Sequence, residues 1–292
     1  MKNIFHRIAA TTFTAITLFC TATNAQTPAP PAANSLLWEI SGNGLKKPSY
    51  VFGTIHMICE DDFEIKDKVK KALKKADNYV VEADVFSAES MKAMQEGSMS
   101  AVPQSKRLSA AQFATVDSIL KLKAGVSLQQ LETLKLSSIG SFLVIKTFAC
   151  PTMKYYETEL LKMSKERNMP FLTLETVQEQ MSFYEKSYSD SFSIEQMKVY
   201  DQYKGMMDQL VKDYKQENLS ALHEELTEDK FMDNNSLYWM LEVRNKNWAE
   251  KMPVMMKKGS NFFAVGAAHL SGKHGILGML QAKGYTVRPI MN

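Results

Sequence analysis

Two histidines of the sequence end the same short motif. The tetrads GTIH (53–56) and GAAH (266–269) each follow an apolar run that is typical of a β-strand. In an open α/β sheet, ligands bind beyond the carboxyl ends of the strands, and a glycine there lets the backbone turn sharply. One such tetrad is a weak signal, but two in the same setting predict that His56 and His269 lie at the functional edge of one sheet.

Two glutamates have a matching placement. Glu82 follows the run NYVV (78–81) and Glu175 follows FLTL (171–174), and a carboxylate buried there without a partner is unfavourable. Two imidazoles and two carboxylates suit a divalent cation such as zinc, manganese or cobalt, with an open position for water. The same groups can instead perform acid–base catalysis without a metal. A third possibility for any one of them is a purely structural role, as a helix cap or a satisfied core residue.

Arg244 is a further candidate for the site. It lies among tryptophan, methionine and valine residues in a helix expected over 237–252, just before the strand expected over 262–265. A guanidinium on the buried face of that helix needs an acidic partner. We therefore expect Arg244 to orient a carboxylate such as Glu175, or to stabilise negative charge on a substrate oxygen, rather than to lie on the surface.

The pattern of apolar residues predicts the elements that position these side chains. Two strands flank a turn at SGNG (41–44) and form an N-terminal β-hairpin. Strands are expected at 36–40, 50–52, 78–81, 171–174, 262–265 and 285–289, and helices at 65–76 and 277–282. Such alternation predicts an α/β fold with a central, mostly parallel sheet flanked by helices.

Two long helical insertions interrupt this alternation, at 88–147 and 179–228. Their charge-rich sequences are typical of solvated helical hairpins, but two insertions at one edge of a sheet can also cover a site at the strand ends. The sequence leaves both arrangements open. Many of the 19 methionines occupy helical positions, where they are expected to fill gaps in the core.

The N-terminal segment predicts export. Lys2 and Arg7 precede an uncharged run over 8–20 that is too short to span a membrane. We expect a signal peptide at 1–25, a disordered linker at 26–35 and one α/β domain at 36–292. The mature protein is then periplasmic or secreted, without a stable membrane anchor. Its net charge of only +3 for the full chain does not favour nucleic acid as a partner.

Two cysteines remain after removal of Cys20 with the signal peptide, Cys59 and Cys150. In an oxidising compartment, an even number of cysteines predicts a disulfide bond. The bond would tie the segment that follows His56 to the loop at Pro151. The alternative is a pair of buried free thiols.

The order of the motifs resembles the TraB/GumN family over residues 36–292. The motifs that carry the resemblance are GTIH (53–56), VE (81–82), LET (174–176) with Gln180, Arg244-Asn245, VGAAHL (265–270) with Gly272, and GYTV (284–287). The wider group includes Tiki-type metalloproteases, TraB-type pheromone-shutdown proteins, the ChaN iron- or haem-binding proteins and erythromycin esterases. Similarity to Tiki implies a divalent-metal peptidase centred on His56, His269, Glu82 and Glu175. Similarity to the esterases implies a His/Glu pair that activates water without a metal.

These observations predict a secreted or periplasmic hydrolase that is metal-dependent and peptidase-like, with a peptide or small molecule as substrate. A metal-bound water would attack, and Glu82 or Glu175 would accept its proton. Two alternatives stay open: a metal-independent, esterase-like hydrolase, and a protein that binds a peptide, iron or haem at the same residues without turnover.

Overall fold

The structure is a computed structural model that describes residues 33–148 and 150–291. The predicted signal peptide and all but the last three residues of the predicted linker lie outside the described residues. Within them, no helix is both long and apolar enough to cross a membrane.

A six-stranded sheet forms the centre of the fold, with the strand order β6-β4-β7-β2-β1-β8. Its strands are β1 (Leu37–Ser41), β2 (Ser49–Thr54), β4 (Asn78–Val81), β6 (Phe171–Thr173), β7 (Asn261–Gly266) and β8 (Thr286–Pro289). Strands β6, β4, β7 and β2 run parallel to one another, whereas β1 pairs antiparallel with both β2 and β8. The predicted α/β fold, its mostly parallel sheet and its N-terminal hairpin are therefore confirmed.

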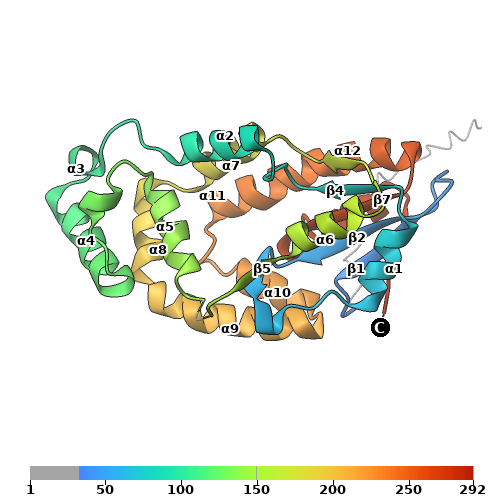
Figure 1. The fold of residues 1–292 in the computed structure, drawn as a ribbon, viewed down its shortest axis with the longest axis horizontal. Coiled ribbons are helices and arrows are strands. Elements are labelled where there is room, and N and C mark those ends of the chain that lie inside the picture. Colours follow the sequence, from blue (N-terminus) through green and yellow to red (C-terminus); the bar gives the residue numbers. More distant parts are fainter. Residues whose placement is uncertain (1–32, 149, 292) are drawn as a thin grey trace, which may run out of the picture.

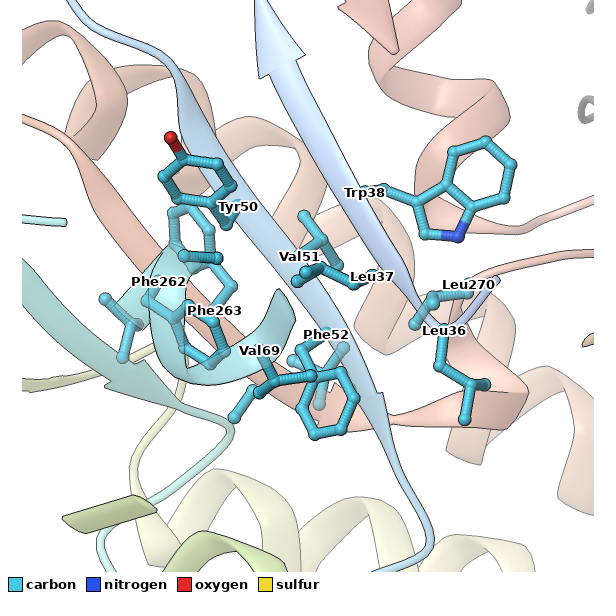
Figure 2. Packing of buried hydrophobic residues seen from close by; sticks show 14 of the residues in the cluster. Leu36, Leu37, Trp38, Tyr50, Val51, Phe52, Val69, Phe262, Phe263 and Leu270 are labelled. Atoms are coloured by element: carbon cyan, nitrogen blue, oxygen red, sulfur yellow. The ribbon is translucent and has the colours of Figure 1, made fainter. Parts of the chain in front are cut away.

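Strands β2 and β7 are buried along their whole length, as is typical of central strands in a sheet covered on both faces. Figure 2 shows Val51 and Phe52 of β2 in the same apolar cluster as Phe262 and Phe263 of β7. Helices around the sheet are α1 (Asp67–Lys75), α6 (Tyr156–Lys165), α12 (Arg244–Lys258) and α13 (Ile276–Ala282). The buried central strands thus fix the positions at which the loops begin at the carboxyl end of the sheet.

The two helical insertions extend to one side of the sheet (Figure 1) and share one apolar core. The first contains α2 (Ala88–Ser98), α3 (Gln104–Arg107), α4 (Ala110–Ala124), η2 (Leu128–Leu131) and α5 (Leu136–Ile145), and the second contains α7 (Val177–Ser187), α8 (Asp190–Lys198), α9 (Tyr200–Gln216) and α10 (Leu219–Leu226). Ile194 and Met197 of the second insertion pack with Leu120 and Ile139 of the first. The insertions therefore form one helical layer rather than two separate hairpins.

A second, two-stranded sheet was not expected from the sequence. Strands β3 (Met57–Cys59) and β5 (Met153–Tyr155) pair antiparallel, and a short helix, η1 (Glu60–Asp62), follows β3. Strands of three residues are too short to show a clear alternation of apolar and polar side chains. A disulfide bond joins Cys59 to Cys150 beside this sheet, with the Cα atoms 5.9 Å apart. The predicted pairing is confirmed.

Replacing both Cys59 and Cys150 by serine is expected to lower the free energy of unfolding by about 4 kcal/mol, because the bond closes a long loop in the unfolded chain. The cysteines are 91 residues apart in sequence. Urea unfolding of the oxidised protein and of the double variant measures the difference. Reduced wild-type protein should unfold like the variant, whereas equal midpoints for the oxidised protein and the variant would contradict the prediction.

Candidate active site

The site lies where three parallel strands end. Strands β2 and β7 are neighbours, with Thr54 opposite Gly266, and β4 flanks β7 on its other side. His56 follows β2, His269 ends the short helix η4 (Ala267–His269) after β7, and Glu82 follows β4. The side chains of both histidines approach Glu82, with 3.8 Å from each Nε2 atom to Glu82 Oε1. The structure thus brings together the histidines that the two tetrads singled out.

Arg244 lies at the centre of this cluster and is only 2% exposed. Its Nη2 donates to Glu82 Oε2 at 2.5 Å and to Glu175 Oε1 at 2.7 Å, and its Nε donates to Glu175 Oε1 at 3.0 Å. Its Nη1 donates to the carbonyl oxygen of Met240 at 3.3 Å and lies 3.2 Å from His269 Nε2. All five N–H groups of the guanidinium therefore have partners. The contact with the carboxylates is thus present, and the expected contact with a substrate oxygen stays a prediction.

The helix that carries Arg244 differs from the expected one. Instead of one α-helix over 237–252, the chain forms α11 (Asn234–Leu237), the π-helix η3 (Tyr238–Val243) and then α12, which begins at Arg244. π-helical turns of this kind are often found at functional sites. The helix packs as expected, since Trp248 of α12 is fully buried against the core and its ring lies 4.4 Å from that of His269.

Glu175 is completely enclosed by donors. In addition to Arg244, Gln180 Nε2 donates to Oε1 at 3.2 Å and Trp248 Nε1 donates to Oε2 at 3.0 Å. Burial raises the pKa of Glu175, and the charge of Arg244 opposes this effect. Both oxygens of Glu175 therefore have hydrogen-bond partners, and Glu175 holds Arg244 in place.

Glu82 is the carboxylate that faces the histidines. Burial opposes its ionisation, but Arg244, His269, His56 and the backbone N–H of Gly266 together hold the pKa of Glu82 well below its usual range. Gly266 N donates to Oε1 at 2.7 Å. A Cβ atom at Gly266 would lie 3.1 Å from His56 Nε2, so glycine at this position permits the close approach of strand and imidazole.

His269 is held as a neutral imidazole. Its Nδ1 lies 2.6 Å from Asn245 Oδ1, and the amide of Asn245 is oriented by its Nδ2, which donates to the carbonyl oxygens of His269 and His274. Because the amide oxygen only accepts, Nδ1 carries the proton and Nε2 accepts from Arg244. Burial lowers the pKa of His269 to about 3, with the positive charges of Arg244 and His56 acting in the same direction and Glu82 opposing them.

His56 differs from His269, because its side chain is partly exposed and its pKa is raised rather than lowered. Half of its side chain is exposed, and Nδ1 donates to Glu157 Oε1 at 2.7 Å. Burial alone would lower the pKa of His56, but Glu157, through its charge and this hydrogen bond, and Glu82 raise it to about 9. The backbone of His56 is left-handed, with φ 53°, a strained conformation for a residue with a side chain. Its carbonyl oxygen accepts from Tyr156 N at 3.0 Å, which ties this turn to the start of α6.

Glu157 was missed by the sequence analysis. It lies in the first turn of α6, directly after β5, and Thr54 Oγ1 also donates to its Oε1, at 2.5 Å. A signal was present, because the predicted disulfide bond already placed the segment after Cys150 beside His56. The pairing of β3 with β5 then carries Glu157 to the imidazole.

A cavity of about 440 Å³ opens above these residues. One end includes His56, Arg244, Gly266 and His269. Most of the remainder is lined by helices of both insertions, including α5, α8, α9 and α10, and Met240 and Leu241 of η3 also contribute. Pockets of this size are typical of small-ligand sites. Of the two arrangements that the sequence left open, the structure therefore shows the insertions covering the strand ends.

The four predicted metal ligands meet, but they do not form a ligand set in the described residues. No group of three or more His, Cys, Asp or Glu side chains there is arranged to hold a metal ion. The physical reason is Arg244, whose guanidinium binds both glutamates and lies 3.2 Å from His269 Nε2. A cation among these side chains would have to displace the guanidinium, so the residues as arranged do not fit one.

Comparison with known proteins gives a family for the chain. No curated protein and no solved structure matches it. The model of the TraB/PrgY/gumN family matches residues 36–289, a range that includes all the site residues described above. The chain therefore belongs to the TraB/PrgY/gumN family.

Proposed function

We propose that the protein is a hydrolase of peptide or ester bonds in which His56 activates water. The observation that carries this proposal is the pair formed by His56 and Glu157, which are 2.7 Å apart, with His56 lining the cavity. A carboxylate that binds Nδ1–H fixes the tautomer in which Nε2 accepts a proton, as in the catalytic triads of many hydrolases.

The reaction needs one proton-transfer group. Neutral His56 takes a proton from water at Nε2 while the water oxygen bonds to the substrate carbonyl carbon. The imidazolium then gives this proton to the departing oxygen or nitrogen as its bond to carbon breaks. The products are a carboxylic acid and an alcohol or amine, and His56 returns to its neutral form.

The buried ions below His56 favour this transfer. Glu82 and Glu175 carry two negative charges and Arg244 one positive charge, which leaves a net negative charge beneath the imidazole. This charge stabilises the imidazolium that forms as water loses its proton. Arg244 and Glu175 act by keeping Glu82 ionised and in position rather than by contact with substrate.

The predicted divalent cation, zinc, manganese or cobalt, stays a prediction, and no step of this mechanism depends on it. We also propose that the protein cleaves peptide bonds and that it is exported from the cytoplasm. A disulfide bond at Cys59–Cys150 is in keeping with an oxidising compartment such as the periplasm or the cell exterior.

The test is turnover by the purified mature chain on short peptides and on 4-nitrophenyl esters, with and without a chelator, alongside measurement of its metal content. Turnover that survives chelation and requires His56 supports the proposal. Turnover that is lost on chelation and restored by zinc, manganese or cobalt would replace it with the metal-dependent mechanism. Binding of a peptide, iron or haem by a protein that hydrolyses none of the substrates would contradict the proposal.

The pH dependence of kcat/KM is expected to report His56. Because the pKa is raised to about 9, the imidazole is protonated below this pH and becomes a base above it. The rate should therefore rise with pH and level off above about pH 9. Glu157→Gln removes a negative charge and should move this break to lower pH. A rate that falls through the same range would contradict the role of His56 as a base.

A further inference from the structure

We propose that the cavity binds an uncharged, bulky apolar group of the substrate, aliphatic or aromatic, next to the bond that is cleaved. This inference rests on the proposed hydrolase function, which places the cleaved bond beside His56. It extends that proposal by naming the class of substrate, which the residues around His56 do not reveal.

The walls of the cavity are apolar. Beyond the end formed by His56, Arg244 and His269, its lining contains no charged side chain among the described residues. Tyrosine, phenylalanine and leucine side chains contribute to it, together with six methionines, Met57, Met197, Met206, Met207, Met232 and Met240. Methionine is flexible and polarizable, so such walls adapt to apolar groups of different shapes. A charged ligand would lose its hydration here without a partner.

Polar atoms of the walls are mostly paired with the protein itself. Tyr214 donates to the carbonyl oxygen of Gly53 at 3.0 Å and Tyr184 donates to that of Ser137 at 3.1 Å. Ser193 is different, because its Oγ is buried and has no hydrogen-bond partner in the described residues, and the residue is only 3% exposed. An unpaired buried hydroxyl is unfavourable. Ser193 therefore fits a ligand that is apolar along its length and carries one polar atom.

Gly140 offers a way to fill the cavity without touching the site. It lies on α5 and lines the cavity, and the nearest atom to an added Cβ would be Met197 Cε at 3.9 Å. Gly140→Leu thus places a side chain in open space and also favours the helix. Gly205→Leu is the matched control, since Gly205 lies on the exposed side of α9 and no atom lies within 4 Å of its added Cβ.

The experiment titrates the mature protein and both variants with the fluorescent probe N-phenyl-1-naphthylamine and then displaces the probe with 1-decanol. Wild-type protein and Gly205→Leu should bind equally, and Gly140→Leu should bind at least about tenfold more weakly, a difference of about 1.4 kcal/mol. No binding by wild-type protein, or equal binding by all three, would overturn the inference.

Hydrolysis separates this inference from the proposed function. His56→Gln should bind the probe as wild-type protein does but should not cleave 4-nitrophenyl octanoate. If no protein turns over substrate while Gly140→Leu still loses the probe, the apolar site stands and the hydrolase is wrong. If the esters are cleaved but Gly140→Leu prefers octanoate to acetate as strongly as wild-type protein does, the hydrolase stands and the apolar site is wrong.

Discussion

Replacing His56 by glutamine is expected to reduce kcat by about 10²- to 10⁴-fold, the usual contribution of a positioned acid–base group. Glutamine preserves the approximate size of the side chain and a hydrogen bond to Glu157, but it cannot accept a proton from water. The variant should remain folded, because half of the His56 side chain is exposed. Loss of the charged imidazole beside Glu157 should lower the free energy of unfolding at neutral pH, since the raised pKa of His56 stabilises the folded state there. Steady-state kinetics and urea unfolding of the same preparation measure both effects.

His274→Gln is the matched control for this variant. His274 is also partly exposed, with Nε2 3.6 Å from Glu242, but it is not part of the cavity lining. Its loss should leave kcat within about twofold of wild-type protein, well below the effect of removing an acid–base group. Equal rates for His56→Gln and wild-type protein would show that the imidazole does not transfer the proton.

Replacing Arg244 by methionine is expected to lower the free energy of unfolding by about 3 to 5 kcal/mol, because removing one partner leaves buried charges uncompensated. The guanidinium is the cation shared by Glu82 and Glu175. Hydrolysis should also be lost, since Glu82 is then no longer held ionised beneath His56. Urea unfolding gives the first effect, and turnover of the variant under folding conditions gives the second.

Two further variants make this result specific. Changing Glu82 and Glu175 to glutamine together with Arg244→Met removes all three buried charges and should regain much of the lost stability, but not the hydrolysis. Arg107→Met breaks a partly exposed pair with Asp190 and should change the free energy of unfolding by no more than about 1 kcal/mol. Full stability of Arg244→Met would contradict the central place of the guanidinium.

Much of the fold could be predicted from the sequence because its central elements have strong local patterns. The buried strands β2 and β7 contain the apolar runs YVF (50–52) and FFAV (262–265), each followed directly by a glycine. The rule that ligands gather at the carboxyl ends of parallel strands then predicts that His56, His269 and Glu82 lie at one edge of the sheet.

The remaining features depend on contacts between distant segments, which a single sequence does not display. The position of Glu157 follows from the pairing of β3 with β5, across about a hundred residues of chain. The sequence also predicted that Arg244 would reach a carboxylate, but not that one guanidinium would bind both glutamates. The position of the guanidinium depends on the π-helix η3, because Arg244 is the first residue of α12 and directly follows that helix.

The shared core of the two insertions links regions that are far apart in the gene. Because segments 88–145 and 177–226 bury their apolar faces against each other and together enclose the cavity, neither can be exchanged alone without leaving unmatched surfaces. A substitution on one wall changes the selection pressure on the other. Evolution of new substrate preference in this scaffold is therefore expected to proceed by correlated changes in both segments, while the strand ends beneath them keep the same chemistry.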